Sequence, residues 1–258
     1  MARIVQHIRP TVVEPLEKGG YRARLAQSEA DLNAAHALRT ARFRPGHVGS
    51  LDQDALDDQC RHVLVERRAD GALMATFRFM HLANGRGIDH TYSAQFYGLS
   101  KLTRYEKPVV EMGRFCTAEG AGDVDALRVG WALLTRYVDA HRVGLIIGCS
   151  SFPGTATEPF CDALALLKER HLAPDAWRPQ VKAPQVVPFA KTLSGVRPSL
   201  RKAQKTLPPL LRAYLTMGGW VSDHAVIDPD LRTFHVFTGV EVSKIPPVRA
   251  RLLRAAAA

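Results

Sequence analysis

Alternating apolar and polar residues predict a strand, a helix and a hairpin in the N-terminal third of the chain. Residues 21–25 alternate as a half-buried strand does, and Ser28 is a suitable N-cap for a helix that ends near Phe43. Two apolar runs follow, at 62–66 and 73–80, and the Asp-Gly dipeptide between them is typical of a tight turn. These two runs are therefore expected to pair as antiparallel strands.

The middle of the chain predicts a strand, a helix and a second strand. They are expected at 109–117, 126–141 and 143–152. The last run is almost unbroken in apolar residues, as in a strand that is buried on both faces. Such a unit normally pairs its strands in parallel through a right-handed crossover. Two further helices and a final strand are predicted at 158–170, 210–217 and 233–239.

These elements indicate an α+β fold, with a mixed central sheet flanked by helices and a C-terminal extension. Residues 1–20 are rich in proline and charge without a sustained period, which predicts a disordered arm. Residues 174–209 carry seven of the 16 prolines together with a basic run, and predict an extended excursion from the domain. Residues 247–258 are expected to form a frayed basic tail.

Composition narrows the class of protein. The chain has 258 residues, with 35 Lys and Arg against 25 Asp and Glu, so an anionic partner is expected: nucleic acid, anionic lipid or an acidic protein. The four cysteines are widely spaced and indicate neither a disulfide framework nor a zinc site. No apolar run approaches the ~20 residues of a membrane span, and no signal peptide is evident. A cytoplasmic protein is expected, with peripheral membrane contact as a second expectation.

Three separated segments are specific in combination. They are Leu38-Arg39 with Arg42-Phe43, Leu51-Asp52-Gln53-Asp54 with Asp57, and Glu111-Met112-Gly113-Arg114. Together they resemble the pattern L-R…R-x-F…D-x-D-x-x-D…E-[LM]-[GS]-R, which is shared by acyl-homoserine-lactone synthases and bacterial ornithine-lipid N-acyltransferases. Both are GNAT-related groups that take acyl chains from acyl carrier protein.

Segments in the rest of the chain resemble the ornithine-lipid group. They include Tyr92-Ser93-Ala94, Cys149-Ser150-Ser151-Phe152-Pro153-Gly154, His171-Leu172-Ala173-Pro174, Pro208-Pro209-Leu210-Leu211 and Gly219-Trp220-Val221 with Asp228. The resemblance implies a single GNAT-like acyltransferase domain over residues 21–246. The loop 118–123 departs from the family's coenzyme A binders, because it lacks their R-x-x-G-x-G/A.

The resemblance implies transfer of a (3-hydroxy)acyl chain from acyl carrier protein to the α-amine of L-ornithine, which forms lyso-ornithine lipid. No bound cofactor is expected, since the donor is a phosphopantetheine thioester. The same chemistry on another amino acid such as glutamine, and homoserine-lactone synthesis, are alternatives. A non-enzymatic basic module that binds membrane or nucleic acid is a further alternative, although no nucleic-acid-binding motif is present and the basic residues are scattered.

Glu111 is the candidate general base. Acylation of an amine requires a deprotonated nitrogen, a positioned thioester and donors for the oxyanion, and burial on a strand can raise the pKa of a carboxylate toward the working range. A structural ion pair between Glu111 and Arg114 is the alternative. In a regular strand these two residues face opposite sides, so a shared cleft requires a bulge, for which Gly113 is well placed.

The motif residues are expected to bind the acceptor. This set comprises Arg39, Arg42, Phe43, Asp52, Asp54, Asp57 and Arg114. The two helical arginines are candidates for clamping a carboxylate or phosphate, or else form a solvated stripe. The three aspartates are candidates for recognising the ammonium groups of ornithine, or else form an acidic helical turn. No metal site is expected, because the aspartates do not fit an EF-hand frame.

Other residues are assigned to the acyl donor. Donor contacts are expected from Thr117, Gly120, Gly122, Ser150 and Ser151. The two serines end a buried strand, where they can bond a pantetheine amide or act as a cap. Docking of the acidic carrier protein is assigned to Arg128, Arg136 and Lys168. Basic residues at 197–205 and 249–254 are candidates for contact with anionic lipid, or else form a solvated face.

Overall fold

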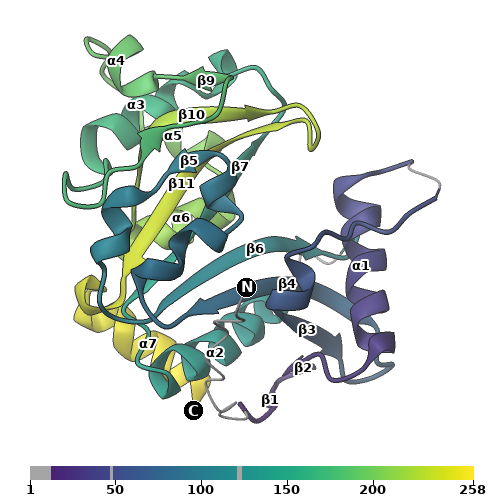
Figure 1. Ribbon diagram of the computed structural model, residues 1–258. Helices are drawn as coiled ribbons and strands as arrows, with labels where there is room; N and C mark the ends of the chain where they lie inside the picture. Colours follow the sequence, from purple (N-terminus) through teal and green to yellow (C-terminus); the bar gives the residue numbers. More distant parts are fainter. Residues whose placement is uncertain (1–12, 47–48, 121–123) are drawn as a thin grey trace, which may run out of the picture.

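A nine-stranded mixed sheet runs through the molecule in the order β1-β2-β3-β4-β6-β7-β11-β10-β9 (Figure 1). The computed structural model describes residues 13–46, 49–120 and 124–258. In chain order the sheet contains β1 Leu16–Lys18, β2 Tyr21–Leu25, β3 Arg61–Arg67, β4 Leu73–Leu82, β6 Val109–Thr117, β7 Leu145–Pro153, β9 Val186–Val187, β10 Trp220–Asp228 and β11 Thr233–Glu241. Every neighbouring pair is antiparallel except β6 and β7, which are parallel.

Helices cover both sides of the sheet. The α-helices are α1 Glu29–Phe43, α2 Val124–Ala140, α3 Cys161–Arg170, α4 Phe189–Thr192, α5 Leu200–Thr206, α6 Pro209–Thr216 and α7 Pro247–Ala257. Short 3₁₀ turns lie at Asp57–Gln59, Gly85–His90, Ser93–Gln95, Ser100–Arg104, Glu158–Phe160 and Val242–Lys244, and a small second sheet pairs β5 Tyr97–Gly98 with β8 Gln180–Val181. Of the helices in the described ranges, none has both the length and the apolar composition of a bilayer crossing.

Strand register divides the central sheet into two faces. Met80 pairs with Glu111 and Glu111 with Ile147, so these side chains share one face, here called the first face. The turns and small strand between residues 85 and 104 pack there, and α1 contacts the same face at β3 and β4. The second face carries Phe79 and Ile146, which pack in a core together with α2 and α7.

The hairpin, the first helix and the strand–helix–strand unit predicted from the pattern are confirmed. β3 and β4 pair antiparallel, and β6, α2 and β7 form the parallel unit. Ser28 caps α1 as expected, and Asp31 completes a capping box by bonding back to the backbone of Ser28. The fold class, a mixed sheet flanked by helices, is as predicted.

Two predictions about the ends of the chain are wrong, and one strand is missing from the predicted elements. Residues 1–12 lie outside the described residues, but β1 within the predicted arm pairs with β2, and Leu16 joins the core. The predicted frayed tail is the helix α7, which packs on α2 and accepts a hydrogen bond from Arg136 at the carbonyl of Ala257. The strand β10 was not predicted, because a bulge between Val221 and Ala225 interrupts its alternation.

Strands β6 and β7 diverge halfway along their length. Their ladder ends at Met112 and Gly148, although β6 continues to Thr117 and β7 to Pro153. Gly148 permits the last contact, because a Cβ there would lie 2.5 Å from the Met112 carbonyl oxygen. Backbone groups beyond this point face a gap between the strands, where a ligand can reach them.

The expected bulge is present in β6, but its left-handed residue is Arg114. The β4–β6 register shifts between Thr76 and Arg78, opposite residues 113–116 of β6. Arg114 has a φ of 54°, whereas a Cβ on Gly113 would meet no atom within 4 Å. The strain therefore lies at Arg114, and its side chain is re-aimed by the bulge.

Candidate active site

A cavity of about 250 Å³ lies where β6 and β7 diverge, and side chains from both faces of the sheet line it. We call it the central cavity. The first face contributes Glu111, Cys149, Ser151 and His235, while the second contributes Met112, Ser150 and, from α6, Leu211 and Tyr214. The opening thus connects the two faces through the sheet.

Glu111 is held in the central cavity by backbone donors. Its two carboxylate oxygens accept hydrogen bonds from the N–H groups of Tyr92 and Ser93, each at 2.7 Å. The side chain is buried, and this burial raises the pKa of the carboxyl above its ordinary value. A buried carboxylate with a raised pKa, open to a cavity, is suited to proton transfer.

Glu111 and Arg114 line the same cavity without forming the ion pair that was the alternative. The guanidinium of Arg114 instead contacts Asp54 at 3.1 Å and Asp52 at 3.3 Å, and stacks on Tyr92 at 5.1 Å from the ring centroid. Among the described residues, Glu111 therefore has no cationic side chain as a direct partner. The bulge brings both residues to one cavity.

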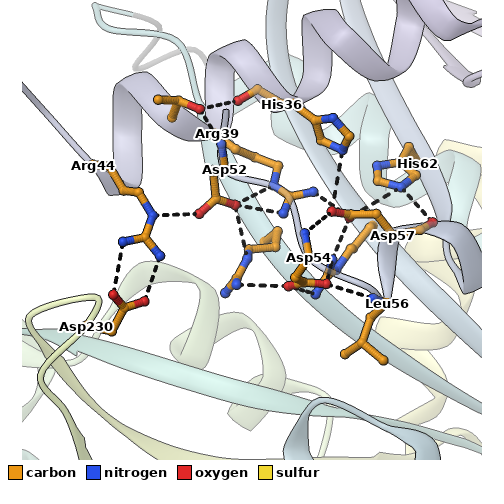
Figure 2. Close-up of polar contacts among 12 residues, drawn as sticks. His36, Arg39, Arg44, Asp52, Asp54, Leu56, Asp57, His62 and Asp230 are labelled. Atoms are coloured by element: carbon orange, nitrogen blue, oxygen red, sulfur yellow. Dashed lines mark hydrogen bonds and ion pairs between the residues drawn. The ribbon is translucent and has the colours of Figure 1, made fainter. Parts of the chain in front are cut away.

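The aspartates and arginines of the motif form a buried network of ion pairs beneath α1 (Figure 2). Arg39, 1% exposed, donates to Asp57 at 2.6 Å and to Asp52 at 2.9 Å. Arg78 of β4 donates to Asp54 at 2.6 Å and to Asp57 at 2.5 Å. These arginines hold the pKa of the Asp57 carboxyl well below its ordinary value against the opposing effect of burial.

This network changes the interpretation of the motif. Arg39, Asp52 and Asp57 satisfy one another, so they have a structural role in place of the predicted contact with substrate. The two alternatives are wrong for these residues as well. Arg39 is not part of a solvated stripe, and Asp52 and Asp57 are paired with arginines instead of being stabilised by a helix dipole alone. The network anchors the segment 51–57 to α1 and the sheet. Asp54, 30% exposed at its side chain, is the member of the aspartate trio most open to solvent.

A further ion pair links the end of α1 to the hairpin of β10 and β11. Arg44, just after α1, donates to Asp230 at 2.6 Å and to Asp52 at 3.3 Å. Asp230 lies in the turn between β10 and β11, so the pair joins this hairpin to the loop beneath α1 (Figure 2).

A polar cavity opens from the central cavity on the first face. Its volume is about 770 Å³, and its acidic lining comprises Asp52, Asp54, Asp228 and Asp230. It shares Tyr92, Arg114 and Asp228 with the central cavity. Asp228 is buried and accepts a hydrogen bond from the N–H of Leu231, and no arginine or lysine of the described chain pairs with it. This carboxylate is available to a cationic ligand.

An apolar groove of about 830 Å³ opens from the central cavity on the second face. Its apolar lining includes Phe115, Leu127, Trp131, Leu210 and Leu252, and three arginines, Arg42, Arg128 and Arg249, also line it. Phe43, Phe115 and Leu210 are shared with the central cavity. An apolar groove with several cationic side chains suits an acyl chain whose carrier is anionic.

The residues predicted to bind the donor are divided among several places. Thr117 lines the apolar groove, whereas Ser150 and Ser151 line the central cavity, and Ser150 bonds the Thr238 hydroxyl at 2.9 Å. Gly120 ends the described part of the following loop with a φ of 72°. Gly122 lies outside the described residues.

The three residues predicted to dock the carrier protein do not lie together on the groove. Arg128 lines it. Arg136 instead bonds the carbonyls of Ala257 and Ala258, and Lys168 bonds the carbonyls of Leu193 and Val196. These hydrogen bonds give both residues a structural role, while Arg42 and Arg249 join Arg128 at the groove.

Asp228 and His235 are site residues to which the sequence analysis gave no role. Both belong to the β10–β11 hairpin, and the bulge in β10 hides the alternation that would have placed Asp228 on the first face. His235 precedes Val236 and Phe237 in an apolar run, where a core position is the ordinary interpretation. Only the register with Ser151 of β7 brings it to the cavity.

A group of three potential metal ligands lies in the ion-pair network. Ligand atoms of His36, Asp57 and His62 are within 4.8 Å of one another. Two arginines already donate to Oδ1 of Asp57, at 2.6 and 2.5 Å. Their positive charges oppose a divalent cation at this position, so the group fits a metal poorly.

Acidification is expected to destabilise the protein before its carboxylates titrate. Burial lowers the pKa of His81 and of His235 to about 4, from 6.5. The unfolded chain therefore binds these protons first. The free energy of unfolding should be highest above about pH 6.5 and fall toward pH 4, by up to ~3 kcal/mol for a fully buried histidine. The raised pKa of Glu111 has the opposite effect, because it stabilises the folded state as the pH falls. The measured fall in the free energy of unfolding is therefore the histidine contribution minus that of Glu111.

Urea unfolding at several pH values measures this effect. His81→Leu serves as the matched variant, because it removes one of the buried titrating histidines and should reduce the fall. The fall should not vanish, since burial also lowers the pKa values of His36, His62 and His171. Equal pH dependence in the variant and the wild type would show that His81 does not contribute.

The chain is similar in sequence to known acyltransferases. An acetyltransferase (GNAT) domain model matches residues 33–131. Four curated relatives are named L-ornithine N(alpha)-acyltransferase. The relative from Agrobacterium fabrum is 27% identical over 243 residues, covering 88% of this chain and 83% of its own length. The relative from Rhodobacter capsulatus is 28% identical, covering 84% and 88%.

Among solved structures, FeeM, an N-acyl amino acid synthase from uncultured soil microbes, aligns over 95% of this chain and 98% of its own, with a TM-score of 0.46 and 8% identity. The matched domain includes most of α1, all of β3, β4 and β6, and the first part of α2. This sequence match, together with the divergence of β6 and β7, identifies the fold as GNAT-like.

Proposed function

We propose that this chain, a homologue of the L-ornithine N(alpha)-acyltransferases with a GNAT-like fold, transfers an acyl group from acyl carrier protein to the α-amine of L-ornithine. One structural observation supports the proposal most strongly. A cavity through the sheet contains Glu111 and joins an apolar groove with cationic residues on one face to an acidic cavity on the other. The groove is complementary to an acyl chain on an anionic carrier, and the acidic cavity is complementary to a cationic acceptor.

The donor occupies the apolar groove in this proposal. The acyl chain lies against the groove's apolar lining, while Arg42, Arg128 and Arg249 attract the phosphate of the pantetheine arm and the acidic carrier protein. The thioester then reaches the central cavity between β6 and β7. Backbone N–H groups in the gap beyond Met112 and Gly148 are candidates for binding the oxyanion.

The acceptor occupies the polar cavity. Ornithine has two ammonium groups and one carboxylate, so it needs anionic partners for the former and a cation for the latter. Asp228 has no cationic partner among the described residues and is the first candidate for an ammonium group. Arg114 lies beside it in the same cavities and is the candidate for the carboxylate.

Glu111 acts as the general base in the proposed reaction. The deprotonated amine attacks the thioester carbonyl carbon, a C–N bond forms, and the C–S bond breaks as the sulfur leaves with the bonding electron pair. Glu111 accepts a proton from the amine. The raised pKa of its carboxyl suits this role, because proton transfer is most efficient when the pKa of the base lies near the working pH.

The exposed apolar side chains of α7 support contact with a membrane that receives the product. Val248 is 61% exposed and Leu252 is 59% exposed, and Arg249 and Arg251 are their neighbours in sequence. Apolar and basic side chains on one helix suit peripheral contact with anionic lipid. We include this contact of a cytoplasmic enzyme in the proposal.

Substituting Asp228 tests the acceptor assignment. Asp228→Asn should raise the KM for ornithine by ~10- to 100-fold, since a charge-assisted hydrogen bond is lost, and leave the KM for the acyl donor unchanged. Turnover with acyl carrier protein is measured with ornithine and, separately, with glutamine. Asp175→Asn is the control, because its carboxylate is 85% exposed, pairs with Arg178 and lines none of these cavities, so the KM for ornithine should not change.

The outcomes separate the candidate acceptors. Ornithine acylated by the wild type, with Asp228→Asn impaired, supports the proposal. Acylation of glutamine but not ornithine would overturn the ornithine assignment and keep the reaction class. A wild-type protein that acylates no amino acid would overturn both.

A further inference from the structure

His235 faces the central cavity with a ring nitrogen that has no partner. The residue lies on β11 opposite Ser151 of β7 and Val226 of β10, and it is 2% exposed. Its Nε2 atom is buried and forms no hydrogen bond. Several buried histidines have an unpartnered ring nitrogen, but among the described residues His235 is the one of them that lines the central cavity, where a ligand can complete the bond.

The hydrogen bonds of Tyr97 determine which nitrogen of His235 carries the proton. The Tyr97 hydroxyl donates its only hydrogen to the carbonyl of His235 at 2.8 Å, and the same oxygen lies 3.1 Å from Nδ1 of the ring. Both contacts are satisfied at once when Nδ1–H donates to the hydroxyl oxygen, and we assign this tautomer. Nε2 is then the deprotonated nitrogen, with a lone pair available.

We infer that Nε2 of His235 is a second proton acceptor in the central cavity, which binds an N–H of the acceptor amine and takes one of the protons lost on acylation. This inference rests on the proposed function. Glu111 and His235 lie on the same face of the sheet and line the same cavity, on strands separated by β7. The amine enters from that face, through the polar cavity.

The reaction removes two protons from the attacking nitrogen, one before and one after the C–N bond forms. An α-ammonium nitrogen starts with three hydrogens, and the amide nitrogen of the product keeps one. One proton leaves before attack, which frees the lone pair that forms the C–N bond, and the second leaves after that bond has formed. The departing sulfur takes up one of the two protons as the C–S bond breaks, and the other passes to solvent. Glu111 and His235 each accept one proton and release it again.

The surroundings of His235 fit a neutral base. Burial lowers the pKa of the imidazole to about 4, so the ring is neutral at neutral pH and the Nε2 lone pair is free. A base this weak accepts a proton only from the cationic nitrogen that exists once the C–N bond has formed. The nearby carboxylate of Asp228 has the opposite effect and favours the imidazolium form.

Two substitutions of His235 test the inference. Asn retains an amide donor near the position of Nδ1, while Gln retains a hydrogen-bonding atom near the position of Nε2, and neither accepts a proton. Each should lower kcat by ~100-fold or more, with the KM for the acyl donor unchanged. A kcat within about threefold of wild type in either folded variant would overturn the inference.

His224 provides a matched control. It is 1% exposed on β10, its Nε2 also has no partner, and its ring lies 5.2 Å from that of Tyr97, but it does not line the central cavity. His224→Gln should lower the melting temperature as the His235 variants do and keep wild-type kcat. A comparable loss of kcat in His224→Gln would attribute the effect to the fold and contradict a role for His235.

Tyr97→Phe provides an independent test of the inference if the His235 variants do not fold. It removes the hydroxyl that fixes the tautomer and keeps the ring, so kcat should fall by ~10-fold while the KM for the donor stays unchanged. Wild-type kcat in Tyr97→Phe would overturn the inference. Failure of the proposed function is recognised separately, because the wild type itself would then acylate no ornithine.

Discussion

Glu111→Gln is expected to lower the rate of ornithine acylation by ~10²- to 10⁴-fold, because an amide cannot take the proton that the amine must lose. The two carboxylate oxygens of Glu111 accept bonds from the N–H groups of Tyr92 and Ser93. In the variant, one of these N–H groups would face the amide NH₂, so some stability is lost as well. Turnover and thermal unfolding of the same preparation separate the two effects.

Cys149→Ala is the matched control for the Glu111 substitution. Cys149 lines the same cavity, and burial raises the pKa of its thiol far above the ordinary value, so it is not a nucleophile at neutral pH. Its removal should change the rate by no more than a few-fold. If Glu111→Gln is folded and keeps the wild-type rate, Glu111 is structural and another group takes the proton.

Arg39→Met is expected to lower the free energy of unfolding by ~3–5 kcal/mol, because it leaves the carboxylates of Asp52 and Asp57 buried with less compensating charge. Urea unfolding measures the change. Arg42→Met, three residues later on the same helix and exposed, should change stability by no more than ~0.5 kcal/mol. Similar values for the two variants would mean that the buried network does not stabilise the fold.

Much of the fold could be predicted from local pattern. The Ser28 cap, the Asp-Gly turn and the strand–helix–strand unit each depend on residues close in sequence. The strand β10 was missed because its bulge breaks the alternation, and α7 was missed because its stability comes from packing on α2.

The candidate site could be predicted only in part, for a different reason. Glu111 is singled out by its motif and lines the cavity. The roles of Arg39 and Asp57 depend on Arg78, which lies 21 residues beyond Asp57 on another strand and belongs to no motif. Sequence spacing does not show whether a carboxylate meets an arginine of its own chain or a substrate. Asp228 and His235 likewise depend on the pairing of β11 with its neighbours.

The short ladder between β6 and β7 has a kinetic consequence under the proposed assignment. Because each substrate has its own entrance, on opposite faces of the sheet, the presence of one does not close the route of the other. Either can then bind first, and both must be present before the thioester carbon is attacked. The fold thus favours a random-order ternary complex, with intersecting lines in a double-reciprocal plot, over a ping-pong scheme with an acylated enzyme.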